Sequence, residues 1–475
     1  MSAVTSPNPH VLVFPYPAQG HMLPLLDLTH QLCLHNLTIT IVITPKNLPF
    51  LSHLLSSHPS ITPLVLPFPS HPSIPAGVEH VKDLGNTGNL PIMVSLRKLQ
   101  DPLVQWFASH PNPPVAIISD FFLGWTQHLA AELNIPRITF YSSGAFLVSV
   151  NLYLFSDAEK FKPLKEVEFG TLPGAPVFKE EHLPSIFRFH RRSDPAWELV
   201  LDGMIANRRS WGSVFNSFDA LEGKYLEHLS KEMGHDRVFG LGPLSLTGLD
   251  SSARGNADSN PNHRVLTWLD GCPDGSVVYV CFGSQKLLSR EQMVALAAGL
   301  EKSGSRFVWV VKKGTTQQTE SGYGAVPEGF EERVAGRGLV LKEWAPQVLI
   351  LSHKAVGGFL SHCGWNSVLE AVVGGVMILA WPMEADQFVN ARLLVEDMGV
   401  AVRVCEGTGV CEGTDSVPES EELGRVIGES MRAGAEAKMK AKDLRQEAFA
   451  AVAAGGSSRR DLDRLVKELG QLKSR

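Results

Sequence analysis

Short apolar runs alternate with helical patterns along the first 150 residues of the chain. Runs rich in Val, Ile, Leu and Phe predict buried strands at 11–14, 37–44, 115–119 and 137–141. From Met22 to Leu32 the apolar residues recur at helical spacing, so the chain opens as strand, helix, strand. Strands joined by such a crossover lie parallel, which predicts an α/β domain. Residues 45–113 are instead rich in Pro, Ser and His, a composition typical of a long loop.

The same alternation returns in the second half of the chain. Strands are predicted at 276–282, 307–311, 339–342, 356–360 and 376–381, with a helix over 291–302 and another near 368–372. Between the halves, residues 244–263 are rich in Gly, Ser and Asn, as linkers are. We therefore expect a Rossmann-like domain over 1–243, a second over 264–450, and a helical segment over 451–475 that packs back on the first domain.

Length and composition favour a soluble protein of two domains. The chain has 475 residues, more than one ordinary core accommodates. Its formal net charge of −6 provides no basic field for nucleic acid or an anionic membrane. The sequence shows neither a leader peptide nor a run of about 18 apolar residues, so we expect a cytoplasmic protein without membrane insertion. Six cysteines without a CxxC pair predict reduced thiols.

Polar residues follow three of the predicted strands in the first half. His21 stands where the loop after the first strand meets a helix, while Asp120 and Ser142 follow the third and fourth strands. The carboxyl ends of parallel strands share one edge, where ligands bind. An imidazole at a helix N-terminus is held neutral and can accept a proton, and a carboxylate can orient it. Without further context, however, such a histidine is more often a cap or surface residue, and Asp120 a turn residue.

The segment from Trp344 to Gln387 is dense in residue types that suit a nucleotide sugar. Trp344, Ala345 and Gln347 supply an indole face for a base and an amide for a ring edge or ribose. Asp386 and Gln387 follow the strand predicted at 376–381, and a carboxylate with an amide suits sugar hydroxyls. Two sheets that present such edges to each other would form a site for two substrates.

Groups able to hold a diphosphate gather at two strand ends: Ser284 after 276–282, and His362, Asn366 and Ser367 after 356–360. Asn366 and Ser367 stand where a helix should begin, and its unpaired amides favour a phosphate. Next to Gly283, Ser284 is also compatible with a simple tight turn. Glu370 follows Ser367 by three residues, so it could cap the helix or accept hydrogen bonds from ribose, and both alternatives stay open.

Asp461 and Asp463 have the carboxylate spacing that metal-dependent transferases use for a divalent ion. They lie among Arg459, Arg460 and Arg464 in the charged C-terminal stretch, far from any predicted strand end. We interpret them as the solvated face of a helix and expect no metal site.

The segment 344–387 resembles the 44-residue signature box of plant family-1 UDP-dependent glycosyltransferases. The box residues match at Trp344, Gln347, His362, Gly364, Trp365, Asn366, Ser367, Glu370, Pro382, Asp386 and Gln387, whereas Met377 replaces a usual proline. The resemblance extends over nearly the whole chain and implies a GT-B fold, in which two Rossmann-like parallel-sheet domains face each other across a cleft. It implies His21 as the catalytic base, Asp120 as its partner and Ser142 as a contact to the sugar or diphosphate.

The resemblance also implies the reaction: inverting transfer of a sugar from a UDP-sugar co-substrate to a hydroxyl of a flavonoid or another small phenolic acceptor, without a metal or further cofactor. Trp344, Ala345 and Gln347 would hold uracil, Glu370 the ribose, and Trp365, Asp386 and Gln387 the sugar. Gln387 favours glucose, while rhamnose and xylose stay open. We expect a monomer. Two rival classes are a nicotinamide oxidoreductase, disfavoured because GxGxxG loops are missing, and a non-catalytic nucleotide-sugar-binding protein.

Overall fold

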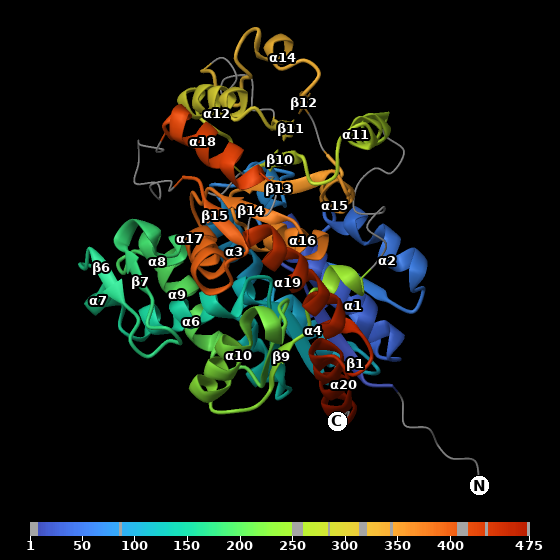
Figure 1. The fold of residues 1–475 in the computed structure, drawn as a ribbon. Helices are drawn as coiled ribbons and strands as arrows, with labels where there is room; N and C mark the ends of the chain where they lie inside the picture. Colours follow the sequence, from blue (N-terminus) through green and yellow to red (C-terminus); the bar gives the residue numbers. More distant parts are fainter. Residues whose placement is uncertain are drawn as a thin grey trace.

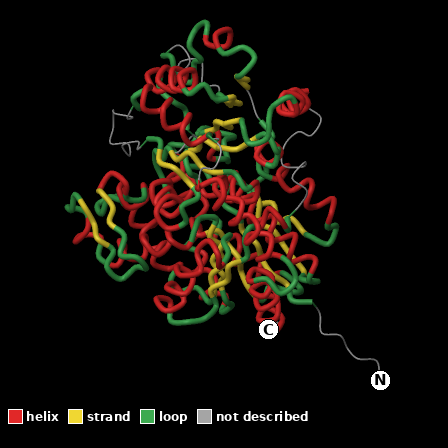
Figure 2. The backbone as a smooth tube through the Cα atoms, viewed as in Figure 1, coloured by secondary structure: helices red, strands yellow, loops and turns green. Residues whose placement is uncertain are grey.

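Two separate parallel sheets organise the chain, one in each half of the sequence (Figure 1, Figure 2). The computed structural model describes residues 8–84, 88–248, 260–283, 286–312, 321–342, 345–405, 417–432 and 436–472. Most strand residues are fully buried, because helices cover parallel sheets on both faces and the strands are correspondingly rich in Val, Ile and Phe. The arrangement is the GT-B architecture of two Rossmann-like domains.

The first sheet has the strand order β3-β2-β1-β4-β5-β8-β9, and every neighbouring pair is parallel. Its strands are β1 (His10–Phe14), β2 (Thr38–Ile43), β3 (Thr62–Val65), β4 (Ala116–Asp120), β5 (Arg137–Tyr141), β8 (Gly212–Phe215) and β9 (Val238–Gly240). The strand order reverses between β1 and β4. In open α/β sheets, ligands bind outside the carboxyl ends of the strands at such a switch point.

The second sheet has the order β12-β11-β10-β13-β14-β15 and is also parallel throughout. Its strands are β10 (Val277–Cys281), β11 (Arg306–Val310), β12 (Gly338–Leu341), β13 (Val356–Ser361), β14 (Met377–Ala380) and β15 (Ala401–Arg403). Here the order reverses between β10 and β13. The loop that carries His362 therefore leaves the second sheet at its own switch point.

Helices connect these strands in both domains. Those of the first domain are α1 (Gln19–Leu34), α2 (Ser52–Ser57), α3 (Asn89–Arg97), α4 (Gln100–Ser109), α5 (Thr126–Leu133), α6 (Ala145–Ser156), α7 (Ala158–Phe161), α8 (Ser185–Phe189), α9 (Pro195–Asn207) and α10 (Asp219–Met233). The small hairpin β6 (Glu166–Glu168) and β7 (Val177–Lys179) lies between α7 and α8. The second half contributes α11 (Asn260–Asp270), α12 (Arg290–Lys302), α14 (Phe330–Arg333), α15 (Gln347–Leu351), α16 (Trp365–Gly374), α17 (Gln387–Arg392), α18 (Ser420–Met431), α19 (Glu436–Val452) and α20 (Ser457–Gly470).

The long loop predicted over residues 45–113 is wrong in large part. The segment contains β3 at the sheet edge, α3 and α4, and α3 packs against α9. Pro91 and Pro102 stand in the first turns of α3 and α4, where a missing backbone N–H removes no helical hydrogen bond. The high proline content therefore led to the prediction of a loop where α3 and α4 form, although both helices have buried faces that include Ile92 and Leu103.

The C-terminal helix α20 lies against the first domain, beside β9 (Figure 1). The Asp461 carboxylate accepts a hydrogen bond from the Gly240 backbone N–H at 2.8 Å, and the Ser458 hydroxyl donates to the Gly242 carbonyl at 2.6 Å. Burial raises the pKa of Asp461. The interpretation of Asp461 as part of a solvated face is therefore wrong, although Asp463 is exposed. The spacing of charges along α20 could not predict that the Gly240 backbone N–H, in the edge strand β9, would bond to the Asp461 carboxylate.

Two domain limits differ in detail from the expected ones. Residues 249–259 of the expected linker lie outside the described residues, and α11 already begins at Asn260, within the span 244–263. Helix α19 runs through the expected limit at residue 450 to Val452, and it already packs against α10 of the first domain. None of the described helices combines the length and the apolar character that crossing a membrane requires.

Candidate active site between the two domains

His21 and Asp120 are in direct contact at the switch point of the first sheet. His21 lies in the first turn of α1, and its Nδ1 is 2.9 Å from Oδ2 of Asp120, the last residue of β4. The Asp120 side chain is fully buried, and its other oxygen accepts from the Phe122 backbone N–H at 2.8 Å. Because the Asp120 carboxylate can only accept in this contact, Nδ1 of His21 carries the hydrogen and donates it, which leaves the lone pair of the imidazole at Nε2. The His21 side chain keeps 19% of its surface exposed, so Nε2 can meet a substrate.

Aromatic rings fix the orientation of the His21 imidazole. Phe121 stacks on it with a centroid distance of 5.4 Å and an interplanar angle of 15°. Phe122 lies at 4.6 Å, and Tyr16 meets the ring edge-on at 5.3 Å. Burial and the charge of Asp120 raise the pKa of Tyr16 well above its ordinary value, so this phenol stays neutral. These three rings therefore restrict rotation of the His21 imidazole.

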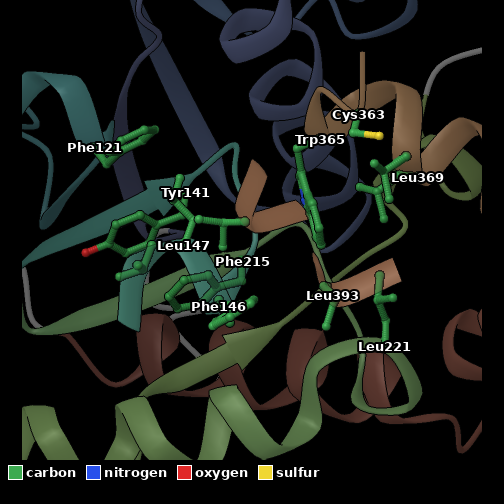
Figure 3. Close-up of a cluster of buried hydrophobic side chains, with 14 of the residues drawn as sticks. Phe121, Tyr141, Phe146, Leu147, Phe215, Leu221, Cys363, Trp365, Leu369 and Leu393 are labelled. Atoms are coloured by element: carbon green, nitrogen blue, oxygen red, sulfur yellow. The ribbon is translucent and has the colours of Figure 1, made fainter. Parts of the chain in front are cut away.

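The second domain reaches the loop that carries His21. The Asn366 side-chain amide donates to the Gly20 carbonyl at 2.8 Å, and the Trp365 indole N–H donates to the Asn216 carbonyl at 2.9 Å. A Cβ at Gly144 would lie 2.9 Å from the Trp365 ring, closer than side chains pack. Figure 3 shows Trp365 beside the buried aromatic cluster of the first domain. The first turn of α16 therefore contacts the first turn of α1, next to His21.

The start of α16 provides groups for an anion. Its N-cap is Gly364, and no side chain caps the helix, so its first backbone amides are available. The His362 ring fits tightly between two glycines, because a Cβ at Gly283 or Gly364 would come within 2.8 Å or 2.6 Å of it. Burial lowers the pKa of His362 to about 4, so the ring is neutral, and among the described residues its Nδ1 has no partner. Ser284 lies outside the described residues.

Gln347, Ser367 and Glu370 form one hydrogen-bonded group. The Gln347 amide donates to the Glu370 carboxylate at 2.6 Å and to the Ser367 hydroxyl at 3.1 Å, while Tyr279 donates to Gln347 Oε1 at 3.2 Å. Because α16 begins at Trp365, Ser367 is not the N-cap, and the capping alternative for Glu370 is excluded. Trp344 lies outside the described residues, and the buried Ala345 accepts from the Gln347 backbone N–H at 2.8 Å.

Asp386 and Gln387 belong to the turn that begins α17. Gln387 Oε1 accepts from the backbone N–H groups of Met383 and Glu384, both at 2.9 Å. The Asp386 carboxylate accepts from Asn390 at 2.8 Å. Burial raises the pKa of Asp386, and the charge of His21 is near enough to lower it in part. The turn therefore lies within electrostatic reach of the imidazole.

Ser142 follows β5 and is buried, and its hydroxyl has no partner among the described residues. Next to it, the buried Glu222 carboxylate accepts from the backbone N–H groups of Ala145 and Phe146 at 2.9 Å and 2.8 Å, and so holds the start of α6. Neither Glu222 nor Asn216 is predicted from the sequence as a site residue. Asn216 follows β8, a four-residue strand too short for its polar successor to be recognised as a strand-end residue.

Three comparisons with known proteins agree with this geometry. The family model described as "UDP-glucoronosyl and UDP-glucosyl transferase" matches residues 258–414. UDP-glycosyltransferase 89A2 of Arabidopsis thaliana is 55% identical, covering 98% of this chain and 96% of the relative. Flavonol 3-O-glucosyltransferase UGT89B1 of the same plant is 49% identical, with the same coverage. The crystal structure of Arabidopsis thaliana UGT89C1 complexed with UDP-L-rhamnose is 40% identical, covers 98% of this chain and 100% of its own, and superposes with a TM-score of 0.80. The chain belongs to the UDP-glycosyltransferase family and has its two-domain GT-B fold.

Proposed function

We propose that the enzyme transfers glucose from UDP-glucose, with inversion and without a metal ion, to a hydroxyl of a flavonoid or another small phenolic acceptor. One observation carries this proposal. His21, whose Nδ1 lies 2.9 Å from Oδ2 of Asp120, directly follows Gly20, whose carbonyl accepts a hydrogen bond from the Asn366 side chain of the second domain at 2.8 Å. A base from one domain therefore faces the anion-binding helix terminus of the other.

The reaction follows from this juxtaposition. Nε2 of His21 takes the proton of the acceptor hydroxyl while the oxygen attacks the anomeric carbon from the face opposite the diphosphate. The new C–O bond forms as the bond to the phosphate oxygen breaks, which inverts the anomeric centre and releases UDP. Asp120 stabilises the imidazolium that results.

The leaving diphosphate meets fixed dipoles. The first amides of α16, the side chains of Asn366 and Ser367, and His362 would donate to its oxygens, with Ser284 and Ser142 as further hydroxyl contacts. Such preorganised donors stabilise charge as it develops, a role that other transferases assign to a cation. A neutral His362 can donate one N–H without bringing a charge.

The donor is assigned from the groups around Glu370 and Gln387. Trp344, Ala345 and Gln347 would hold uracil, and ribose hydroxyls would bind the Glu370 carboxylate. Trp365, Asp386 and Gln387 would contact the sugar. Because Oε1 of Gln387 already accepts two backbone N–H groups, its Nε2 is the part that can donate to a sugar hydroxyl. Relatives carry names for both glucose and rhamnose transfer, so the choice of glucose rests on Gln387.

An aromatic acceptor suits the surroundings of His21. Phe121, Phe122 and Tyr16 surround the imidazole, and Phe121 also lines a cavity of about 270 Å³ whose other lining residues belong mainly to α6 and α9. Apolar and aromatic side chains line most of that cavity, and Asn151 supplies a buried Oδ1 without a partner among the described residues. A planar phenol with a second hydroxyl matches this lining.

We also propose that the enzyme works as a cytoplasmic monomer. Both substrates would bind within one chain, and the five described cysteines are free thiols, as proteins of reducing compartments have.

A matrix of donors against acceptors tests the proposal. UDP-glucose, UDP-rhamnose, UDP-xylose and UDP-galactose are each combined with flavonols and simple phenols, and products are identified by mass spectrometry and NMR. We expect β-linked O-glucosides with UDP-glucose as the best donor. Products from UDP-rhamnose alone would overturn the donor assignment, and UDP binding without any product would favour the non-catalytic class.

A further inference from the structure

A fully buried arginine lies beneath the His21–Asp120 pair. Arg137 is the first residue of β5 and has no exposed surface. Its guanidinium donates to five oxygens: Ser119 Oγ at 2.8 Å, Thr139 Oγ1 at 2.9 Å, Asn207 Oδ1 at 2.8 Å, Ser210 Oγ at 3.0 Å and the Asp120 carbonyl at 3.3 Å. Nη1 makes three of these five contacts with its two hydrogens, so some of them share a hydrogen, while Nε and Nη2 make one contact each.

None of these five partners carries a negative charge. Within the described part of the chain, Arg137 forms no ion pair with a carboxylate, although an uncompensated buried charge is strongly destabilising. Burial lowers the pKa of Arg137 to about 10, so the side chain stays protonated at neutral pH. A neutral side chain with several N–H donors could also connect β4, β5 and α9 by hydrogen bonds. The positive charge of Arg137 therefore requires a separate explanation.

The Asp120 carboxylate offers one. β4 and β5 pair in register with Ile117 opposite Arg137, so the arginine side chain extends along β4 past Ser119 to Asp120. The Asp120 side chain is fully buried, and among the described residues its carboxylate pairs with no cationic side chain other than His21. A buried carboxylate and a buried guanidinium therefore lie on adjacent strands, where opposite charges attract each other.

We propose that Arg137 is a positioning residue for the transfer: its buried guanidinium stabilises the negative charge of Asp120 and fixes the strand end that aims this carboxylate at His21. The inference rests on the proposed function, because it concerns the same base. Because Arg137 has no exposed surface, it can contact neither substrate and would act on the base through Asp120. The other ionisable groups that face the pair are Tyr16 from the segment after β1 and Asp386 from the turn before α17, while Tyr141 lies beside Arg137 itself.

The test is the pH profile of kcat/KM in the full-length enzyme. Arg137→Met removes the charge and keeps much of the volume. Loss of a nearby positive charge raises the proton affinity of the His21–Asp120 pair, so we expect the acid limb of the profile to move upward by about one pH unit. At the foot of that limb kcat/KM then falls about tenfold relative to the wild type.

Matched variants separate charge from structure. Ser210→Ala removes one neutral partner of Arg137 and keeps the charge, and Arg137→Lys keeps the charge in a different shape. We expect both to leave the acid limb in place, even if they unfold at a lower temperature. Arg137→Gln replaces the Met variant if that one does not fold.

Two outcomes would overturn the role of Arg137: an unshifted acid limb in the neutral variants, or an equal shift in Ser210→Ala. A double-mutant cycle gives a second readout. If Arg137 acts through Asp120, Arg137→Met should produce no further shift of the acid limb in an Asp120→Asn background. These results leave the proposed function standing, since that function is tested separately, by the products of the donor and acceptor matrix and by the turnover of His21→Ala.

Discussion

Single residues divide the work of this site between one proton acceptor and a set of fixed donors. The Asp120 contact leaves Nε2 of His21 as the accepting atom, and the stacked Phe121 ring holds it in place. On the donor side, Gln347 ties Glu370 to Ser367, so the groups proposed for uracil, ribose and phosphate are prearranged. Prearranged groups need little reorganisation when charge develops.

Glu370→Ala should mainly weaken the donor. Hydrogen bonds to a charged group contribute about 1.5–3 kcal/mol, so we expect the KM for the UDP-sugar to rise about 10- to 100-fold while kcat changes by less than about threefold. Steady-state kinetics with varied donor measures this. Glu227→Ala, an exposed position on α10, is the control and should resemble the wild type. An unchanged donor KM in Glu370→Ala would remove the ribose contact.

His362 should make stability depend on pH. Its folded pKa of about 4 lies below its ordinary 6.5, so between these values the unfolded chain binds a proton that the folded chain does not. Stability is therefore lost as the pH falls through this window, by about 1–2 kcal/mol between pH 7 and pH 5. The free energy of unfolding is measured by urea titration without nucleotide at pH 7 and pH 5. Its decrease between these values should be about 1–2 kcal/mol smaller in His362→Gln than in the wild type. His263→Gln, an exposed control, should keep it, and equal curves for His362→Gln and wild type would refute the assignment.

At the scale of elements, the sequence predicted nine strands because each is an apolar run ended by a polar or small residue. It missed β3, β6, β7, β8, β9 and β15, each of three or four residues, and the helices α3 and α4, whose prolines resemble loop composition. The sequence places His21, Asp120 and Asp386 just after predicted strands. Because the carboxyl ends of parallel strands share one edge of a sheet, these residues could be assigned to the ligand-binding edges. The sequence alone could not identify Arg137 or Glu222, because their roles depend on which strands are neighbours rather than on local pattern.

Gly144→Ala should disturb the packing of the start of α6 against Trp365 at the start of α16. The added Cβ would lie 2.7 Å from Glu222 Oε1 and 2.9 Å from the Trp365 ring. We expect kcat to fall about tenfold or more because a small displacement of reacting groups is costly to rate. The control is Gly170→Ala, where nothing lies within 4 Å of the added carbon. Wild-type kcat in Gly144→Ala would show that this contact is not needed for turnover.

On the scale of the whole molecule, the chain ties its two domains together at several points away from the imidazole. Helix α19 packs against α10 of the first domain and α16 of the second, and α20 then returns to β9. Asp397 of the second domain accepts from Tyr225 at 2.8 Å and from Lys224 at 2.9 Å. These contacts hold the second sheet opposite the first, so that a sugar bound by one domain faces the base of the other.

The most direct test compares His21→Ala with the wild type in turnover and in UDP binding. General-base catalysis contributes about 10²- to 10⁴-fold, so kcat should fall by at least that much, while the Kd for UDP from calorimetry stays within about twofold. His30→Ala, on the same helix, serves as the control and should keep its kcat. Wild-type turnover in His21→Ala would contradict the central claim that the first domain supplies the base for a sugar held by the second.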